Sequence, residues 1–190
     1  MPDADAFLTK LKQCYLAADM HLQRKFNRSL PFADALFDRW ERAKLLGFGQ
    51  GASIYNSSLI FGEVTVGEDV WVGPFTILDG SGGGLKIGRC CSISAGVHIY
   101  THDSVLHALS GRKAPLHKSP VSVGECSFIG PHSIVKAGVS IGSHCVVGAH
   151  SYVNRDVPDR TIVAGSPALR VGVVEISGDE VRLKYDREET

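Results

Sequence analysis

The chain has 190 residues, 44% of them hydrophobic, which is enough to bury one sizeable core. Its 20 Lys and Arg balance its 20 Asp and Glu, so bulk charge indicates neither a nucleic-acid partner nor an anionic membrane. The sequence has no long apolar run and no basic start followed by an apolar stretch, so we expect neither a membrane span nor a signal peptide. The five cysteines are an odd number without a Cys-x-x-Cys motif, and we expect them to be reduced in a cytoplasmic protein.

Residues 1–48 are predicted to form a helical cap. Apolar residues recur at three-to-four spacing from Phe7 to Leu22, and Pro31 starts a second segment that stops at Gly47. We expect these helices to cover the first coil of the following segment, because an uncapped end would expose apolar surface. They could also line a pocket for an acceptor.

Within residues 49–172, aliphatic residues recur at a spacing of six in three successive runs. These positions are Ile54, Ile60, Val66, Val72, Leu78, Ile87, Ile93, Ile99, Val123, Ile129, Val135, Ile141, Val147 and Val153. A period of six fits neither an α-helix nor a simple amphipathic strand, and it predicts a parallel β-helix with three hexads in each triangular coil. Glycine follows several of these positions, where we expect it to relax a corner that needs positive φ.

Two insertions interrupt the period. Residues 80–84 add a glycine-rich stretch, which we interpret as a bulged corner because it lacks the Lys-Ser/Thr of a phosphate loop. Residues 101–120 replace about one whole coil, and a long loop extruded from a regular solenoid is typically functional. Residues 173–190 are predicted to form one or two short strands and a charged tail.

The period of six, the loop opened by His102, and the closing segment Val163-Ala164-Gly165-Ser166-Pro167-Ala168 resemble the hexapeptide-repeat acyltransferases. The branch most similar is that of the galactoside and maltose acetyltransferases and the sugar O-acetyltransferases of polysaccharide pathways. The resemblance implies an all-β, left-handed parallel β-helix and a homotrimer with active sites between subunits. It also implies acetyl-coenzyme A as donor, a sugar or nucleotide-linked sugar as acceptor, and no metal.

His102 matches the catalytic histidine of that family. A sugar hydroxyl is a poor nucleophile until a base takes its proton, and an imidazole can do so near neutral pH. Asp103 or a backbone carbonyl could fix the tautomer of the ring, and His98 could assist. Asp79, beside the glycine insertion, could bind a sugar hydroxyl or orient an amine.

The resemblance also gives candidate coenzyme positions in the late coils. They are Gly130, Gly148, Ala149, Asn154, Arg155 and, one position later than the family's basic residue, Arg170. Small residues there would let pantetheine approach the backbone, and Arg155 could meet a phosphate. Pro131 has no N–H to offer a thioester carbonyl, so stabilisation of an oxyanion must come from elsewhere.

Two other functions fit the same fold. The gamma-class carbonic anhydrases bind zinc through three histidines, whereas His132 and His150, one coil apart, supply only two ligands. A solenoid can also serve as a non-catalytic scaffold, but a scaffold needs neither the His102 loop nor the coenzyme-like closing segment. Metal analysis separates the first alternative, and acetyl-coenzyme A turnover separates the second.

Overall fold

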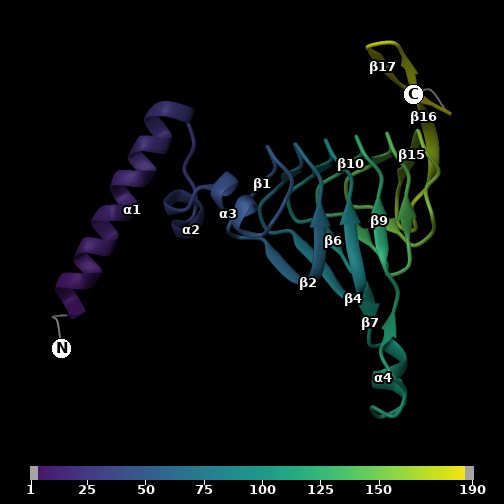
Figure 1. The fold of residues 1–190 in the computed structure, drawn as a ribbon, viewed down its shortest axis with the longest axis horizontal. Helices are drawn as coiled ribbons and strands as arrows, with labels where there is room; N and C mark the ends of the chain where they lie inside the picture. The colour runs from purple at the N-terminus through teal and green to yellow at the C-terminus, as the bar shows by residue number, and fades with distance from the viewer. Residues whose placement is uncertain (1–3, 187–190) are drawn as a thin grey trace.

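The protein is a parallel β-helix with helices at its start, a loop projecting from its side and a hairpin at its end (Figure 1). The structure is a computed structural model that describes residues 4–186. Three helices come first: α1 (Ala4–Phe26), α2 (Phe32–Leu36) and α3 (Arg39–Leu45). Among the described residues, no helix is long and apolar enough to cross a membrane.

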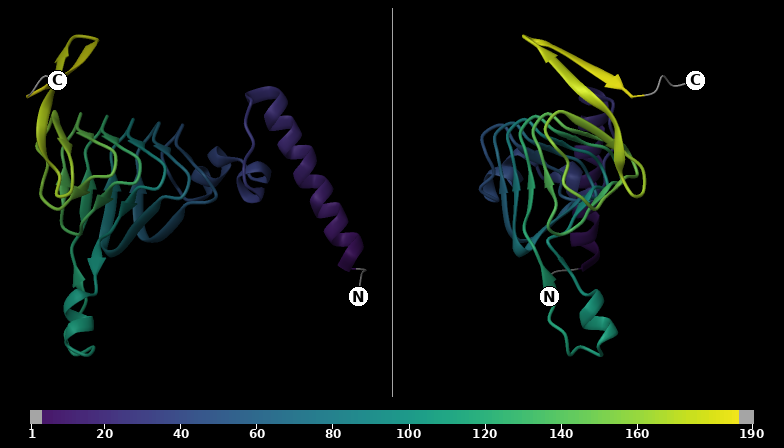
Figure 2. Two further views of the ribbon diagram at one scale, coloured as in Figure 1. Left: turned by 180° about the vertical axis from the view of Figure 1, so that it is seen from behind. Right: turned by 90° about the vertical axis from the view of Figure 1, so that its right-hand side faces the viewer.

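The helical segment contacts the β-helix through its last part. Ala43 in α3 and Phe48, just after it, belong to the buried core of the first coil. α1 extends away from the coils, and none of its residues is buried (Figure 2). The segment predicted to start at Pro31 is divided into two helices, α2 and α3. The division lies at Asp38, whose side chain accepts hydrogen bonds from the N–H groups of Trp40 and Glu41 and so caps the start of α3.

Three faces of parallel strands form the β-helix. The first face contains β1 (Ser53–Ile54), β3 (Trp71–Val72), β5 (Ser92–Ile93), β10 (Phe128–Ile129), β13 (Val146–Val147) and β15 (Thr161–Ala164). The second contains the first parts of β2 (Leu59–Val66) and β4 (Ile77–Ile87), then β6 (His98–Ile99), β11 (Ile134–Val135) and β14 (Tyr152–Val153). The third contains the last parts of β2 and β4, then β9 (Val121–Val123) and β12 (Ser140–Ile141).

The predicted period of six is confirmed as the lining of the core. The second residue of each short strand points inward, and Ile54, Ile93, Ile129 and Val147 are completely buried. Each coil hydrogen-bonds to the next, as in the bond from Gly130 N to Val147 O at 2.8 Å. The narrow interior is therefore filled by aliphatic side chains stacked at the spacing of neighbouring strands.

The predicted role of the glycines that follow these strands is wrong. A Cβ at Gly130 would lie 2.6 Å from the backbone N of Ala149 in the next coil, so this position needs glycine for close approach. Positive φ falls two residues later, on non-glycine residues such as Cys126 (55°), His132 (58°) and His150 (54°). The sequence shows the period, but not which corner residue turns left-handed.

The predicted loop and C-terminal strands are both present. β7 (His102–Asp103) pairs antiparallel with β8 (His117–Lys118) to form the stem of the loop, and α4 (Val105–Leu109) lies at its tip. At the end of the chain, β16 (Leu169–Ser177) and β17 (Glu180–Tyr185) form an antiparallel hairpin that continues from β15. The last residues of the predicted charged tail, 187–190, lie outside the described part of the chain.

Candidate active site

His102 and Asp79 meet where the loop leaves the β-helix. Leu78 and Ile99 are paired in neighbouring coils, so the residues that follow them, Asp79 and Tyr100, start the same corner one above the other. From there the chain reaches His102, whose Nδ1 lies 2.7 Å from Oδ2 of Asp79. The Asp79 side chain is 2% exposed and that of His102 is 36% exposed, so a buried carboxylate holds one edge of a ring that is open to solvent.

Ser81 and Thr101 complete the surroundings of the Asp79 carboxylate. The Ser81 hydroxyl lies 2.5 Å from Oδ1 of Asp79 and 3.2 Å from Nδ1 of His102, and the Ser81 N–H donates to the same Oδ1 at 3.0 Å. The Thr101 N–H donates to Oδ2 at 3.4 Å. Both carboxylate oxygens are therefore hydrogen-bonded, which fixes the side chain in one orientation.

The glycine insertion brings this cluster together. A Cβ at Gly82 would lie 1.9 Å from the carbonyl oxygen of Thr101 and 2.9 Å from Cβ of His102. Only a residue without a side chain lets β4 lie this close to the base of the loop. The bulge predicted from the sequence is therefore part of the site, and Ser81 within it is a residue that the sequence analysis missed.

These contacts lower the pKa of Asp79. Burial alone would raise the pKa, but hydrogen bonds from Ser81 and the contact with His102 outweigh it, so the carboxyl stays ionised below its usual range. An ionised Asp79 accepts the Nδ1–H of His102 and leaves the lone pair on Nε2. The ring is thereby oriented to accept a proton at Nε2.

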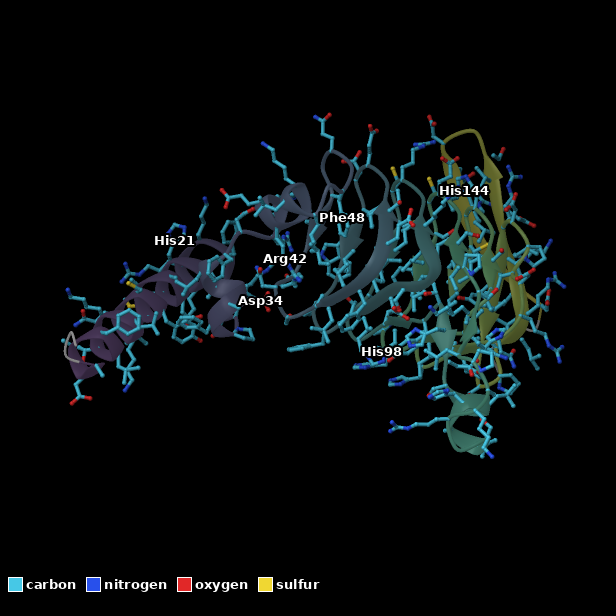
Figure 3. All side chains as sticks on the ribbon, turned by 60° about the horizontal axis from the view of Figure 1, so that its bottom comes forward. His21, Asp34, Arg42, Phe48, His98 and His144 are labelled. Atoms are coloured by element: carbon cyan, nitrogen blue, oxygen red, sulfur yellow. The ribbon has the colours of Figure 1, made fainter. Side chains whose placement is uncertain are left out.

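Asp103 and His98 lie outside this contact. The Asp103 carboxylate accepts from the Val105 N–H at 3.1 Å, at the start of α4. The ring of His102 is therefore held by Asp79 and not by the predicted Asp103. His98 lies on the outer side of β6, with its Nδ1 3.3 Å from the Tyr100 hydroxyl. Figure 3 shows His98 on the side from which the loop projects and His144 on the opposite side.

The candidate coenzyme residues fall into two groups. Gly130, Gly148 and Ala149 lie at the corner before the second face, while Asn154 and Arg155 lie after it, at the corner of His102. A full face of the prism thus separates the first group from His102 in the same chain.

Three of these positions have polar groups without a partner in the described chain. Oδ1 of Asn154 is buried and has no hydrogen-bond partner among the described residues. Within residues 4–186, the Ala149 N–H donates to no acceptor. Pro131, by comparison, has no N–H at all. Arg155 is exposed and forms no ion pair in the described chain, whereas Arg170 pairs with Asp186 at 3.1 Å.

The two histidines considered for zinc are neighbours, but they do not form a metal site. The rings of His132 and His150 are stacked, with centroids 5.2 Å apart and an angle of 14° between them. No group of three or more His, Cys, Asp or Glu in the described part of the chain could hold a metal ion. His132 and His150 therefore supply two ligands, whereas a catalytic zinc site needs three protein ligands.

Residues 120–155 match the family of the bacterial transferase hexapeptide (six repeats). The matched segment runs from the end of the extruded loop through β9 to β14, which are strands of the β-helix. Among curated proteins, the chain is 42% identical over 95 residues to the protein CapG of Staphylococcus aureus. That match covers 48% of this chain and 54% of CapG, so it spans about half of each protein.

Solved structures share the fold of this chain. AntD, an N-acyltransferase from Bacillus cereus in complex with dTDP-4-amino-4,6-dideoxyglucose and coenzyme A, has a TM-score of 0.60 at 21% identity, over 70% of this chain and 87% of AntD. The hexapeptide-repeat acetyltransferase VCA0836 from Vibrio cholerae has a TM-score of 0.55 at 24% identity, over 86% of this chain and 92% of that one. These likenesses support the left-handed parallel β-helix as the fold.

Proposed function

We propose that this protein is a coenzyme A-dependent acyltransferase that moves an acetyl group to a hydroxyl or amine of a sugar or nucleotide-linked sugar. The observation that carries the proposal is the contact of 2.7 Å between Nδ1 of His102 and the buried carboxylate of Asp79, at the base of the extruded loop. A histidine held in this way is suited to general base catalysis, and the sequence resemblance matches His102 to the catalytic histidine of the hexapeptide-repeat acyltransferases.

The chemistry follows from the free Nε2 of His102. As the acceptor oxygen or nitrogen attacks the thioester carbonyl, Nε2 takes its proton and Asp79 stabilises the imidazolium that forms. A carbon–oxygen or carbon–nitrogen bond forms, the carbon–sulfur bond breaks, and the imidazolium returns the proton to the thiolate of coenzyme A. His102 ends the cycle neutral, so no other proton source is needed.

Donor binding is assigned to the late coils. The resemblance assigns Gly130 and Gly148 to the pantetheine arm, Asn154 Oδ1 and the Ala149 N–H have no hydrogen-bond partner in the described chain, and we assign Arg155 to a phosphate. Two of the solved structures with this fold support coenzyme A as the donor, since AntD was solved with coenzyme A and VCA0836 with acetyl-coenzyme A. The AntD complex with a dTDP-linked amino sugar likewise supports a nucleotide-linked acceptor.

The complete site needs a second subunit, and we assign the protein to a homotrimer. His102 lies one face away from Gly130 and Ala149 in its own chain, so a neighbouring chain can bring the two groups together. The loop tip is apolar and open, with Leu106 64% and Leu109 81% exposed, as expected of a segment that contacts another subunit. The five cysteines are free, which fits the reducing cytoplasm as its location.

The deciding experiment is an acceptor screen with acetyl-coenzyme A that reads the release of free thiol. Sugars, amino sugars and their nucleotide-linked forms are compared with amino acids. We expect thiol release that depends on a sugar-containing acceptor. If none of the acceptors in the panel gives thiol release, the proposal is contradicted. Zinc-dependent activity toward carbon dioxide would favour the carbonic anhydrase alternative.

A further inference from the structure

A pocket far along the chain from His102 lies between the helical segment and the first coil. Its volume is about 530 Å³, and it is lined by the end of α1, by α2, by the start of α3 and by Tyr55. That volume is within the range of pockets that hold small organic ligands. Neither His102 nor Asp79 lines it, so the proposed reaction leaves this pocket unexplained.

The charge in the pocket is positive. The lining contains three cations, Lys25, Arg28 and Arg39, and two carboxylates, those of Asp34 and Asp38. None of these cations forms an ion pair with a carboxylate in the described chain. Both carboxylates are already used by the backbone. Asp34 accepts from the N–H groups of Asn56 and Ser57, and Asp38 caps α3. Because the lining cations outnumber the carboxylates and none is paired with one in the described chain, they can attract an anionic ligand.

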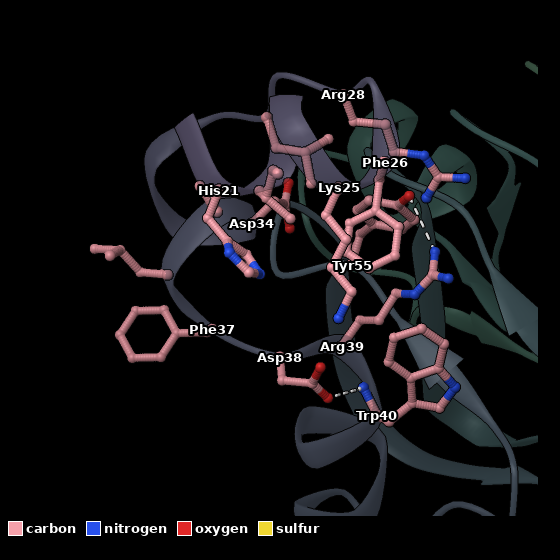
Figure 4. Close-up of a pocket in the computed structure, with 14 residues that line it drawn as sticks. His21, Lys25, Phe26, Arg28, Asp34, Phe37, Asp38, Arg39, Trp40 and Tyr55 are labelled. Carbon is pink, nitrogen blue, oxygen red and sulfur yellow. Dashed lines mark hydrogen bonds between the residues drawn. The ribbon is translucent and has the colours of Figure 1, made fainter. Parts of the chain in front are cut away.

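Aromatic rings accompany these cations. The guanidinium of Arg39 lies 4.1 Å from the ring centroid of Trp40 and 5.3 Å from that of Tyr55, and it donates to the Tyr55 hydroxyl at 3.1 Å. These contacts hold Arg39 in one position before any ligand binds. Figure 4 shows the His21 ring and the Lys25 side chain directed into the space beside them. Trp40 remains 50% exposed, so part of its ring is free to stack.

We propose that this pocket binds a nucleoside diphosphate group. The phosphates lie against Lys25 and Arg39, the His21 ring donates a hydrogen bond, and the base stacks on the open part of Trp40. A nucleotide-linked sugar and the ADP part of coenzyme A both contain such a group. The inference goes beyond the proposed transfer reaction, because it needs neither His102 nor turnover.

Trp40 itself reports binding. The chain has two tryptophans, so Trp71→Phe leaves Trp40 as the only indole, and the fluorescence of the full chain is followed during titration with UDP, dTDP, ADP, coenzyme A and uridine. We expect saturable quenching by diphosphates and at least tenfold weaker binding of uridine. Binding of UDP or dTDP identifies a nucleotide-linked sugar as the source, and binding of ADP and coenzyme A alone identifies the coenzyme.

Matched variants test the contribution of charge. In the Trp71→Phe background, Lys25→Ala should weaken diphosphate binding about tenfold, Lys25→Arg should restore it, and Lys12→Ala on the same helix but outside the pocket should change nothing. Circular dichroism checks that α1 is intact in each variant. His102→Ala should bind as the parent does, which separates this inference from the proposed reaction. No quenching by any diphosphate up to millimolar concentration, equal binding of uridine, or an unchanged affinity in Lys25→Ala would overturn the proposal.

Discussion

Asp79 is a buried carboxylate at the base of the loop. It orients His102, and both of its oxygens are hydrogen-bonded inside a corner of the β-helix. An ionised group in such a place is tolerated only because Ser81, Thr101 and His102 supply the contacts that water would otherwise make. Loss of its charge should therefore affect stability as well as catalysis.

The first prediction concerns acid stability. Since the pKa of Asp79 is lower in the folded protein than its ordinary value of 3.8, its contribution to stability is present above that value and is lost as the pH falls through the folded pKa. We expect Asp79→Asn to lower the free energy of unfolding at pH 7. The difference from the native protein should shrink below about pH 4.

Urea unfolding at several pH values measures this difference, with Asp103→Asn as the control. Asp103 is a carboxylate on the same loop that contacts only the start of α4 among the described contacts, so it should not reproduce the profile. A constant gap between native protein and Asp79→Asn from pH 3 to pH 7 would mean that the carboxylate of Asp79 is not held as described.

At the scale of the coil, the spacing between neighbouring coils depends on glycines that follow the strands. A methyl group at Gly130 would meet the backbone N of Ala149 at 2.6 Å, whereas one at Gly148 would meet the side-chain Cβ of Ala164 at 2.9 Å. At Gly130 the methyl group would also lie 2.7 Å from Val147 O and 2.8 Å from Gly148 C, whereas at Gly148 the next nearest atom is 3.5 Å away. The Gly148 methyl group therefore requires a smaller movement of the next coil. The two positions therefore differ although the sequence pattern treats them alike.

The second prediction follows from this difference. Gly130→Ala should lower the free energy of unfolding by about 1–3 kcal/mol, and Gly148→Ala should lower it less. The midpoint of urea unfolding measures both, provided that the slope is unchanged. An equal loss in the two variants would show that the coils can separate more freely than the contacts indicate.

The third prediction concerns the donor. Acetyl-coenzyme A should raise the melting temperature, because a ligand that binds only the folded chain stabilises it by mass action. Arg155→Ala should reduce this shift without altering the fold, since Arg155 is exposed and lies outside the core. Arg182→Ala, on the terminal hairpin, is the matched control. If Arg155→Ala keeps the native shift, Arg155 does not contact the coenzyme.

The sequence predicts the β-helix well because its core is periodic. Every residue from Leu78 to Val153 in the aliphatic series is buried. The two insertions in the period fall at residues 80–84, within β4, and at the extruded loop. It predicts the site less well, because the partner of His102 lies 23 positions earlier and meets it only through the register between coils. Alignment of Leu78 with Ile99 would place Asp79 below the loop, but no local pattern identifies Ser81.

The helical segment shows the same limit. Apolar spacing predicts helices before the coils, yet it does not show that Asp38 divides the second segment or that α1 extends away from the β-helix. The cap at Asp38 is visible in the sequence as Asp followed by Glu41 three positions later, a pattern typical of a helix start. The direction of α1 depends on few contacts outside the helix, such as Tyr15 with Phe32, and so cannot be inferred from periodicity.

The fourth prediction concerns the whole assembly. Light scattering should give three times the 20.4 kDa mass of one chain. Because His102 and the group of Gly130 and Ala149 lie on different corners, subunits of His102→Ala mixed with subunits of Ala149→Trp should recover part of the activity that each variant lacks alone. Recovery requires sites shared between chains. An active monomer, or mixed subunits that stay inactive after verified exchange, would contradict the assignment.

The fifth prediction tests the central claim most directly: the rate of acetyl-coenzyme A-dependent thiol release by His102→Ala, with the best acceptor from the screen. We expect a fall of about a hundredfold or more, the usual loss when a general base is removed, while the melting temperature and the coenzyme-induced shift stay near native. A folded His102→Ala protein that transfers acetyl at the native rate would contradict the account, and the base would have to be sought at another residue, beginning with His98.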